Sequence, residues 1–137
     1  MKNILVTGGA GFIGSNFIIK QINETENIII NYDKLTYAGN LENLDEVENN
    51  TRYKFINGDI CDQKRIKAII ERFKPNVIIN FAAESHVDRS IDGPDQFIET
   101  NIVGTYIILN QALKYYEKIK SNKDFRFIHI STDEVFG

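Results

Sequence analysis

A glycine-rich segment near the start of the chain has the residue types and spacing of a phosphate-binding turn. Thr7 is followed by glycines at positions 8, 9, 11 and 14. Glycine suits such a turn because it tolerates positive φ, and because a backbone without Cβ atoms can approach a pyrophosphate closely. An apolar run at residues 4–6 precedes the motif and a helical pattern from Phe12 follows it, so a helix N-terminus would face the phosphates. The segment therefore predicts a Rossmann-type dinucleotide site.

An acidic residue after the next apolar run bears on which dinucleotide binds. Asp33 lies nineteen residues after Gly14 and follows the run at residues 28–32. A carboxylate there can accept hydrogen bonds from ribose hydroxyls and would repel a 2′-phosphate, so NAD is favoured over NADP. Lys34 leaves two alternatives open, since it is either a cation that tolerates a phosphate or a solvated surface lysine.

A second acidic residue, Asp59, follows the third apolar run. At that position its carboxylate could accept a hydrogen bond from an adenine amino group. The alternative is that it caps the helix starting at Gln63, although Asp62 is closer and better placed for that role.

The elements that must position these residues alternate along the chain. Apolar runs rich in β-branched or aromatic residues predict strands at residues 4–6, 28–32, 53–56, 77–81 and 125–130. Helical spacing predicts helices over residues 12–22, Gln63 to Phe73 and Asp95 to Ile119, and a polar, partly helical surface segment over residues 41–52. This alternation is typical of an α/β, doubly wound parallel sheet of Rossmann type, covered on both faces, with strand order 3-2-1-4-5. We expect residues 1–137 to form one domain.

Composition and charge argue against several other classes of protein. Lys and Arg total 16 against 19 acidic residues, and the basic ones are scattered, so we expect no nucleic-acid partner and no anionic membrane surface. No apolar run is long enough to cross a bilayer. The single cysteine, Cys61, has no basic neighbour in sequence, so we expect an inert thiol, no metal site and a reducing, cytoplasmic setting.

Four segments resemble the extended short-chain dehydrogenase/reductase family, and within it the dTDP-glucose 4,6-dehydratases. They are residues 8–16, 33–41, 80–91 and 131–137, and the likeness runs over essentially the whole chain. The resemblance implies a tightly held NAD that takes a hydride from C4 of the glucose. Water then leaves across C5 and C6, and the hydride returns to C6. It also implies a lyase acting on a nucleotide-sugar substrate, with dTDP-glucose expected, in dTDP-rhamnose biosynthesis.

The same resemblance assigns the acid–base chemistry to the end of the chain. Loss of water needs a base for the C5 proton and an acid for the C6 hydroxyl. By resemblance Glu134 is the base and Asp133 the acid, with Thr132 and Ser85 hydrogen-bonding the substrate near C4. Neighbouring strand residues point to opposite faces, so both acids can serve one substrate only if the fifth strand has already ended.

The cofactor contacts also follow from the resemblance, and the small side chains of Ala82 and Ala83 suit close approach to a cofactor. His86 has no proton-transfer role in the family, and His129 is expected to be a satisfied structural residue. The expected contacts are Gly8, Gly11, Phe12, Ile13, Gly14, Asp33, Lys34, Thr36, Asp59, Ile60, Phe81, Ala82, Ala83, Ser85 and Thr100.

One pair of family residues has no counterpart within residues 1–137. The family carries a tyrosine and a lysine, four residues apart, on the helix after the fifth strand. Tyr116 and Lys120 have that spacing but precede the fifth strand, and we assign them to a solvated helical end. We therefore expect an incomplete NAD-binding domain, the N-terminal portion of an enzyme, that binds NAD and does not turn over alone. Full-length family members are homodimers, and the helix from Asp95 to Ile119 would belong to their four-helix interface.

Two competing functions remain open. A UDP-sugar 4-epimerase or decarboxylase shares the fold and NAD but needs no acid–base pair at C5 and C6, so Asp133 and Glu134 argue against it. A non-catalytic NAD-binding regulator built on the same fold is compatible with the missing tyrosine and lysine.

Overall fold

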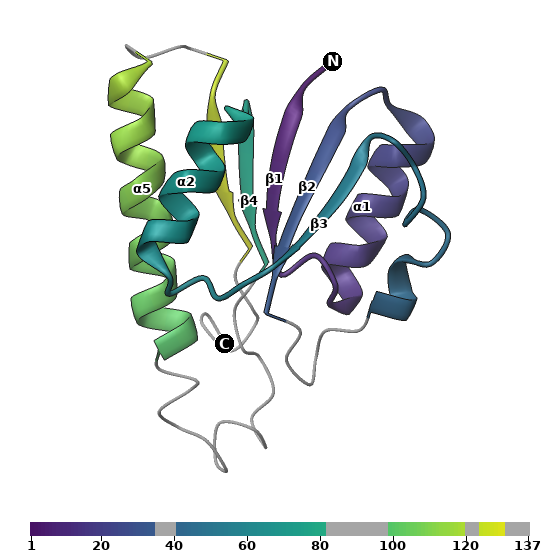
Figure 1. The fold of residues 1–137 in the computed structure, drawn as a ribbon, viewed down its shortest axis with the longest axis horizontal. Helices are drawn as coiled ribbons and strands as arrows, with labels where there is room; N and C mark the ends of the chain where they lie inside the picture. The colour runs from purple at the N-terminus through teal and green to yellow at the C-terminus, as the bar shows by residue number, and fades with distance from the viewer. Residues whose placement is uncertain (35–40, 82–98, 120–123, 131–137) are drawn as a thin grey trace.

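Five parallel strands form a single sheet at the centre of the molecule. The computed structural model describes residues 1–34, 41–81, 99–119 and 124–130. Within them the strand order is β3-β2-β1-β4-β5, which confirms the predicted order (Figure 1). The strands are β1 (Asn3–Thr7), β2 (Ile28–Asp33), β3 (Tyr53–Asn57), β4 (Val77–Asn80) and β5 (Arg126–His129).

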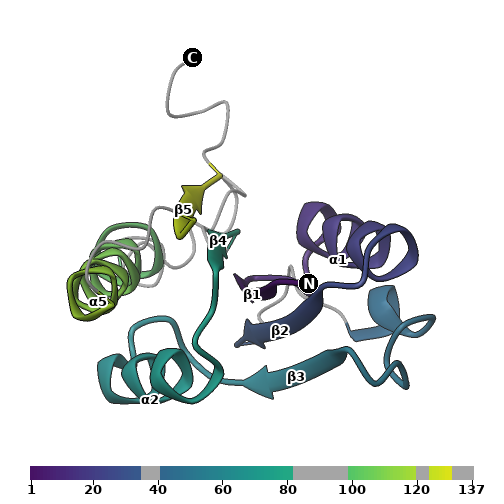
Figure 2. The ribbon, with the colours of Figure 1, turned by 90° about the horizontal axis from the view of Figure 1, so that it is seen from above.

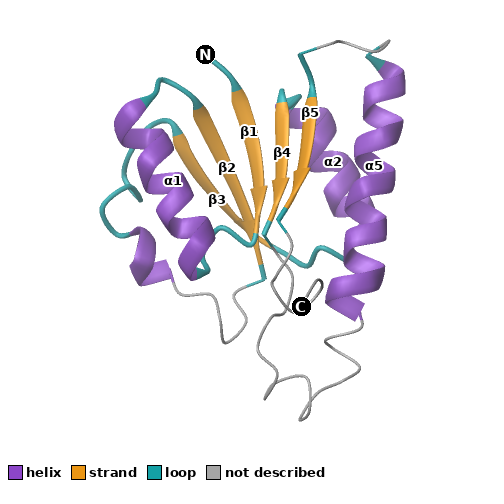
Figure 3. Cartoon of the chain, turned by 180° about the vertical axis from the view of Figure 1, so that it is seen from behind, coloured by secondary structure: helices purple, strands orange, loops and turns teal. Residues whose placement is uncertain are grey.

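Helices cover both faces of this sheet, as predicted. The helix α1 (Phe12–Glu24) lies on one face, while α2 (Gln63–Phe73) and α5 (Thr105–Lys118) lie side by side on the other (Figures 2 and 3). A 3₁₀ turn, η1 (Leu41–Leu44), follows β2, so the segment over residues 41–52 is partly helical as expected. None of the helices in the described ranges has the length and apolar content needed to cross a membrane.

The core has two layers because side chains of a strand alternate between the two faces of the sheet. Leu5, Ile30 and Ile78 belong to the layer beneath α2 and α5. Ile4 and Val6 belong to the layer beneath α1. The central strands β1, β2 and β4 are buried on both faces, which accounts for their continuous apolar runs.

The helix α2 has the bounds that its sequence predicts, and its ends show why. Asp62 is the N-cap residue, and its Oδ1 accepts a hydrogen bond of 3.1 Å from the backbone N–H of Arg65. At the other end Lys74 adopts a left-handed conformation with φ of 46°, and Pro75 follows it. The cap is therefore Asp62, which leaves Asp59 available for another role.

The long predicted helix differs from the expectation at its start. Residues 95–98 lie outside the described ranges, and the segment η2 (Glu99–Gly104) is a π-helical turn that leads into α5. Each π-helical hydrogen bond spans one residue more than an α-helical bond, so the turn shifts the phase of the helix. The spacing of apolar residues alone does not reveal such a shift.

Candidate dinucleotide-binding site

The glycine turn lies at the carboxyl end of β1 and leads directly into α1 (Figure 1). Gly8 has φ of 77°, and its N–H donates to the carbonyl of Tyr32 at 3.1 Å. The N–H of Gly11 donates to the Gly8 carbonyl at 3.3 Å, which closes the turn. A positive φ in a closed turn favours glycine at position 8, which is the physical basis of the predicted motif.

Gly14 is confined by the turn that it follows. A Cβ at this position would lie 2.6 Å from the Gly8 carbonyl oxygen and 2.8 Å from the Gly9 Cα. Both are backbone atoms, so no side chain can rotate to relieve the contact. The last glycine of the motif thus lets α1 approach the backbone of the turn itself.

The N-terminus of α1 has the properties of an anion-binding helix end. Its N-cap residue is Gly11, no side chain caps it, and its first turn holds no acidic residue. Phe12 and Ile13 are 78% and 62% exposed there. Uncapped N–H groups with the positive end of the helix dipole favour a phosphate, and the two apolar side chains offer a surface to an organic ligand.

Two polar side chains of β2 hold the turn in place. The Oδ2 of Asp33 accepts a hydrogen bond of 2.8 Å from the Ala10 N–H. The Oδ1 of Asn31 accepts one of 3.0 Å from the Gly9 N–H. Asn31 and Asp33 are two residues apart and lie on the same face of β2, with exposures of 0% and 8%. Asp33 therefore stabilises the glycine turn, and it lies at the end of β2, where the sequence predicted a carboxylate that binds the ribose.

Asn31 is a residue that sequence reasoning missed. Its Nδ2 donates to the Tyr53 hydroxyl at 3.1 Å, which links the turn through β2 to β3. Burial raises the pKa of Tyr53, so its hydroxyl stays protonated. On the other side Asn43 donates from Nδ2 to the Ala10 carbonyl at 3.2 Å. The sequence did hold a signal for Asn31, because it is a polar residue inside an apolar run, two positions before Asp33.

Tyr32 supports the loop that follows β3. Its hydroxyl donates to the Asp59 carbonyl at 2.7 Å, and a side chain at Gly58 would collide with its ring. Burial, with the Asp62 carboxylate as the next contribution, raises the pKa of Tyr32 to about 12. The hydroxyl remains a donor at neutral pH, and its hydrogen bond holds the backbone of Asp59 in position at the carboxyl edge of the sheet.

Asp59 and Lys34 form an ion pair across the carboxyl edge. The Lys34 Nζ lies 3.2 Å from Asp59 Oδ2, while Asp59 Oδ1 accepts the Cys61 N–H at 2.9 Å. Partial burial raises the pKa of Asp59. The hydrogen bond from the Cys61 N–H and the nearby Lys34 ammonium group lower it by more than burial raises it, so the pKa of Asp59 lies below its ordinary value. The Lys34 ammonium group is therefore paired with Asp59, rather than being a solvated surface lysine or a cation available to a phosphate. The next residue, Ile60, is buried in the core layer beneath α2.

The ends of β1, β4 and β5 are joined by a chain of hydrogen bonds. The Thr7 Oγ1 donates to Asn80 Oδ1 at 2.6 Å, and Asn80 Nδ2 lies 3.2 Å from His129 Nδ1. This contact agrees with the structural role expected for His129. Phe81 donates its N–H to the Thr7 carbonyl at 2.7 Å and its ring lies 5.7 Å from that of Phe17. Thr7 and Asn80 belong to the site's framework and were not singled out from the sequence.

Several predicted residues lie outside the part of the chain that the structure describes, and their assignments stay predictions. Thr100 lies in η2, but its side chain is not described. Across the described ranges, no group of three or more His, Cys, Asp or Glu side chains gathers in a way that could hold a metal ion. The residues outside the description are Thr36, Ala82, Ala83, Ser85, His86, Thr132, Asp133 and Glu134.

Known proteins resemble the chain both in sequence and in fold. A dTDP-glucose 4,6-dehydratase from Escherichia coli is 60% identical over 98% of this chain and 38% of its own length. A crystal structure of a dTDP-glucose 4,6-dehydratase from Bacillus anthracis in complex with NAD superposes with a TM-score of 0.83. It shares 38% identity and is matched over 100% of this chain and 39% of that one.

A related enzyme class shares the fold as well. A UDP-glucose 4-epimerase from Thermotoga maritima, solved with UDP-glucose, has a TM-score of 0.73 and 35% identity, over 82% of this chain and 34% of that one. The chain thus spans about two fifths of the length of the curated relatives it matches. The family model described as GDP-mannose 4,6 dehydratase matches residues 5–137, and the chain therefore belongs to that family.

Proposed function

We propose that residues 1–137 form the NAD-binding Rossmann domain, in part, of a dTDP-glucose 4,6-dehydratase. This hydro-lyase converts the nucleotide-glucose to its 4-keto-6-deoxy sugar. The single observation behind the proposal is the position of the Asp33 carboxylate, which accepts the Ala10 N–H beside the uncapped N-terminus of α1. The similarity to dehydratases, one of them solved with NAD, supports the same assignment.

The residues at the sheet edge fit NAD. The uncapped N-terminus of α1 would receive the pyrophosphate, and Gly8 and Gly14 allow the tight turn that leads into it. Asp33 would accept hydrogen bonds from the ribose, and Asp59 from the adenine amino group. The exposed side chains of Phe12 and Ile13 would lie against the cofactor.

The Lys34–Asp59 ion pair favours NAD over NADP. A 2′-phosphate beside Asp33 would need a cation to offset the carboxylate, and Lys34 is held by Asp59 at 3.2 Å. Binding NADP would therefore place two negative groups next to each other or cost the ion pair.

Bound NAD supplies a hydride acceptor that returns the hydride later in the cycle. Glu134 is proposed to remove the C5 proton and Asp133 to protonate the leaving C6 hydroxyl, with Thr132 and Ser85 binding the substrate near C4. The strand β5 ends at His129, and both acidic residues lie outside the described part of the chain, so their roles rest on the family resemblance alone.

We further propose that residues 1–137 bind NAD without turning over, because the family's tyrosine and lysine after the fifth strand are not among them. An exposed apolar stripe on η2 and α5 supports a homodimer of the full-length family protein. The proposed cellular role is dTDP-rhamnose biosynthesis in the cytoplasm. The stripe comprises Ile102, Tyr106, Leu109 and Leu113, each between 49% and 65% exposed.

Calorimetric titration of the chain with NAD and with NADP tests the cofactor assignment. We expect NAD to bind more tightly, and Asp33→Asn to weaken NAD by about tenfold, since one hydrogen bond to a charged acceptor is worth about 1.5 kcal/mol. The asparagine retains an acceptor for the Ala10 N–H, so circular dichroism should be unchanged. Equal affinity of the wild type for NAD and NADP would refute the proposed selectivity.

A sensitive product assay with dTDP-glucose and UDP-glucose tests the reaction class. We expect neither a 4-keto-6-deoxy sugar nor a C4 epimer from the 137-residue chain. Formation of the keto sugar would disprove the proposed inactivity. Formation of the epimer would favour a 4-epimerase, the second candidate, for which the fold similarity to the Thermotoga maritima enzyme speaks.

A further inference from the structure

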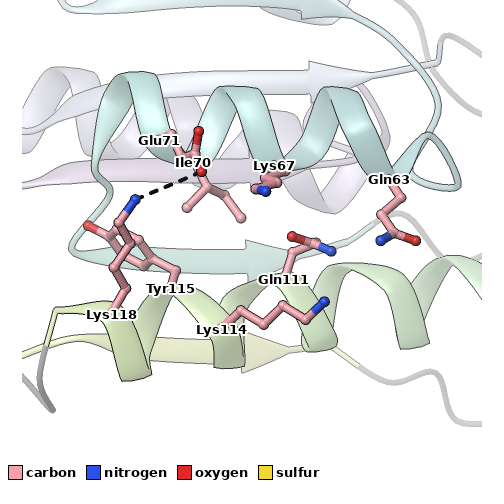
Figure 4. Close-up of a pocket in the computed structure, with 8 residues that line it drawn as sticks. All are labelled: Gln63, Lys67, Ile70, Glu71, Gln111, Lys114, Tyr115 and Lys118. Carbon is pink, nitrogen blue, oxygen red and sulfur yellow. Dashed lines mark ion pairs between the residues drawn. The ribbon is translucent and has the colours of Figure 1, made fainter.

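A groove of about 280 Å³ separates α2 from α5 and plays no part in the dinucleotide site (Figure 4). It lies on the sheet face opposite α1 (Figure 2). Polar side chains from both helices line it, namely Gln63, Lys67 and Glu71 from α2 and Gln111, Lys114 and Lys118 from α5. The groove therefore carries polar side chains from both helices over a partly apolar floor.

The charges in the groove are unbalanced. Three ammonium groups face one carboxylate, so its lining has a surplus of positive charge in a chain whose net charge is −3. Lys118 is paired with Glu71 at 3.9 Å. No described carboxylate lies within 4.0 Å of the Lys67 or Lys114 ammonium groups. These two lysines, one from each helix, remain available to an anion.

Gln111 gives an independent indication of a ligand. The residue is only 4% exposed, yet its side-chain amide makes no hydrogen bond with any residue that the structure describes. Figure 4 shows this side chain projecting from α5 into the space between the helices. Buried polar side chains almost always have a partner, and an amide can both donate to a phosphate oxygen and accept from a hydroxyl.

Of the remaining wall residues, Gln63 is exposed to water, and Tyr115 and Ile70 are engaged by the fold. The Tyr115 hydroxyl donates to the Pro75 carbonyl at 3.1 Å, and Ile70 is buried in the core layer beneath the two helices. The polar recognition groups are thus Lys67, Lys114 and Gln111. The volume corresponds to roughly nine waters of liquid, which suits a small phosphorylated molecule and is too small for a dinucleotide.

We propose that the groove between α2 and α5 is a second ligand site, which binds a small phosphate-bearing molecule through Lys67, Lys114 and the Gln111 amide. The phosphate lies between the two lysines and accepts from Gln111 Nε2. This site is independent of the proposed NAD site because its residues lie on helix faces away from the glycine turn.

Titration calorimetry with inorganic pyrophosphate, at low salt and with NAD present in excess, tests the proposal. The excess NAD occupies the glycine turn, which is the other place where this probe would bind. We expect saturable binding of one pyrophosphate, and at least about a fivefold loss of affinity in each of Lys67→Gln, Lys114→Gln and Gln111→Met.

A matched control separates the groove from general charge. Lys64 is on the same helix but lines a different surface near β3, so Lys64→Gln should leave pyrophosphate affinity unchanged. An equal loss in Lys64→Gln, or no binding by the wild type once NAD is present, would overturn the proposal. Neither result bears on the NAD assignment, which is measured separately without pyrophosphate.

Discussion

The glycine turn and the groove between α2 and α5 both contain buried side-chain amides, but the amides differ in their partners. Asn31, beneath the turn, is fully buried and bonded at both ends, to the Gly9 N–H and to the Tyr53 hydroxyl. Gln111, in the groove, is almost as buried and makes no hydrogen bond to the described residues. The turn is completed by the fold itself, whereas the groove has a polar group that the fold leaves unsatisfied.

This difference separates two ways of building a site. At the turn, β2 fixes the backbone N–H groups of Gly9 and Ala10, so the turn is already ordered before a ligand arrives. A preorganised turn loses little entropy on binding. In the groove the recognition groups are side chains of two helices, and the unmet hydrogen bonds of the buried Gln111 amide are the reason to expect a ligand there.

The largest effect is expected from adding a methyl group at the turn. Gly14→Ala would force a Cβ against the backbone of Gly8 and Gly9. Such overpacking costs about 1–3 kcal/mol of folding stability. The substitution should also displace the N–H groups at the start of α1. Loss of two hydrogen bonds from them to the pyrophosphate would lower NAD affinity by about 100-fold or more.

Urea denaturation and NAD titration measure these two effects. Lys20→Ala, an exposed change on the same helix, is the control and should alter neither quantity. Unchanged NAD affinity in Gly14→Ala would show that the turn is not the pyrophosphate site.

The next effect tests the paired amide. Asn31→Leu has a similar volume but removes the acceptor for the Gly9 N–H, which is then left buried without a partner. We expect a loss of about 1–3 kcal/mol in the free energy of unfolding. Tyr53→Phe removes only the hydroxyl that accepts from Asn31 Nδ2 and should lower the free energy of unfolding by less. If Asn31→Leu were as stable as the wild type, the turn would not depend on β2 for its shape.

The unpaired amide should respond with the opposite sign. Gln111→Met keeps the length and helix propensity of the side chain but removes a buried amide without a partner. We expect the ligand-free protein to gain about 1 kcal/mol, since an unsatisfied buried polar group costs at least that much. For a domain of this size the gain corresponds to a rise of about 3–5 °C in Tm.

Differential scanning calorimetry checks that sign. Gln63→Met changes the exposed amide of the same groove, which water can satisfy, so its Tm should stay close to that of the wild type. A lower Tm in Gln111→Met would mean that the Gln111 amide has a stabilising partner in the fold.

The smallest effect concerns the ion pair at the sheet edge. The pKa of Asp59 is lower in the folded protein than its ordinary value of 3.8. Its contribution to stability is therefore present above that value and is lost as the pH falls through the lower, folded pKa. Because the Asp59 and Lys34 side chains are 36% and 49% exposed, the contribution should be below about 1 kcal/mol.

Urea denaturation of the wild type and Asp59→Asn measures this dependence. The asparagine keeps an acceptor for the Cys61 N–H and removes only the charge. We expect the variant to be slightly less stable at pH 6 and the difference to disappear as the pH falls from 3.8 through the lower pKa of the folded protein. A constant difference across this range would exclude a charge effect.

Much of the fold follows from local sequence signals. The alternation of apolar runs and helical spacing predicted a parallel sheet in the order found, because the runs of the central strands β1, β2 and β4 bury both of their faces. Asp62 and Pro75 mark the ends of α2 in the sequence as in the structure, since capping depends on neighbouring residues. The π-helical turn at Glu99–Gly104 was not predicted, because apolar spacing does not register an added residue per turn.

The sequence by itself determined the glycine turn and the position of Asp33, since both depend on spacing along one βαβ unit. Only the tertiary structure decided that Asn31 accepts a hydrogen bond from the Gly9 N–H and that Lys34 forms an ion pair with Asp59. It also decided that Gln111 is buried without a described partner. These contacts join strands and helices that are far apart in the chain. Their partners are set by how the elements pack, and no local pattern of residue types encodes that packing.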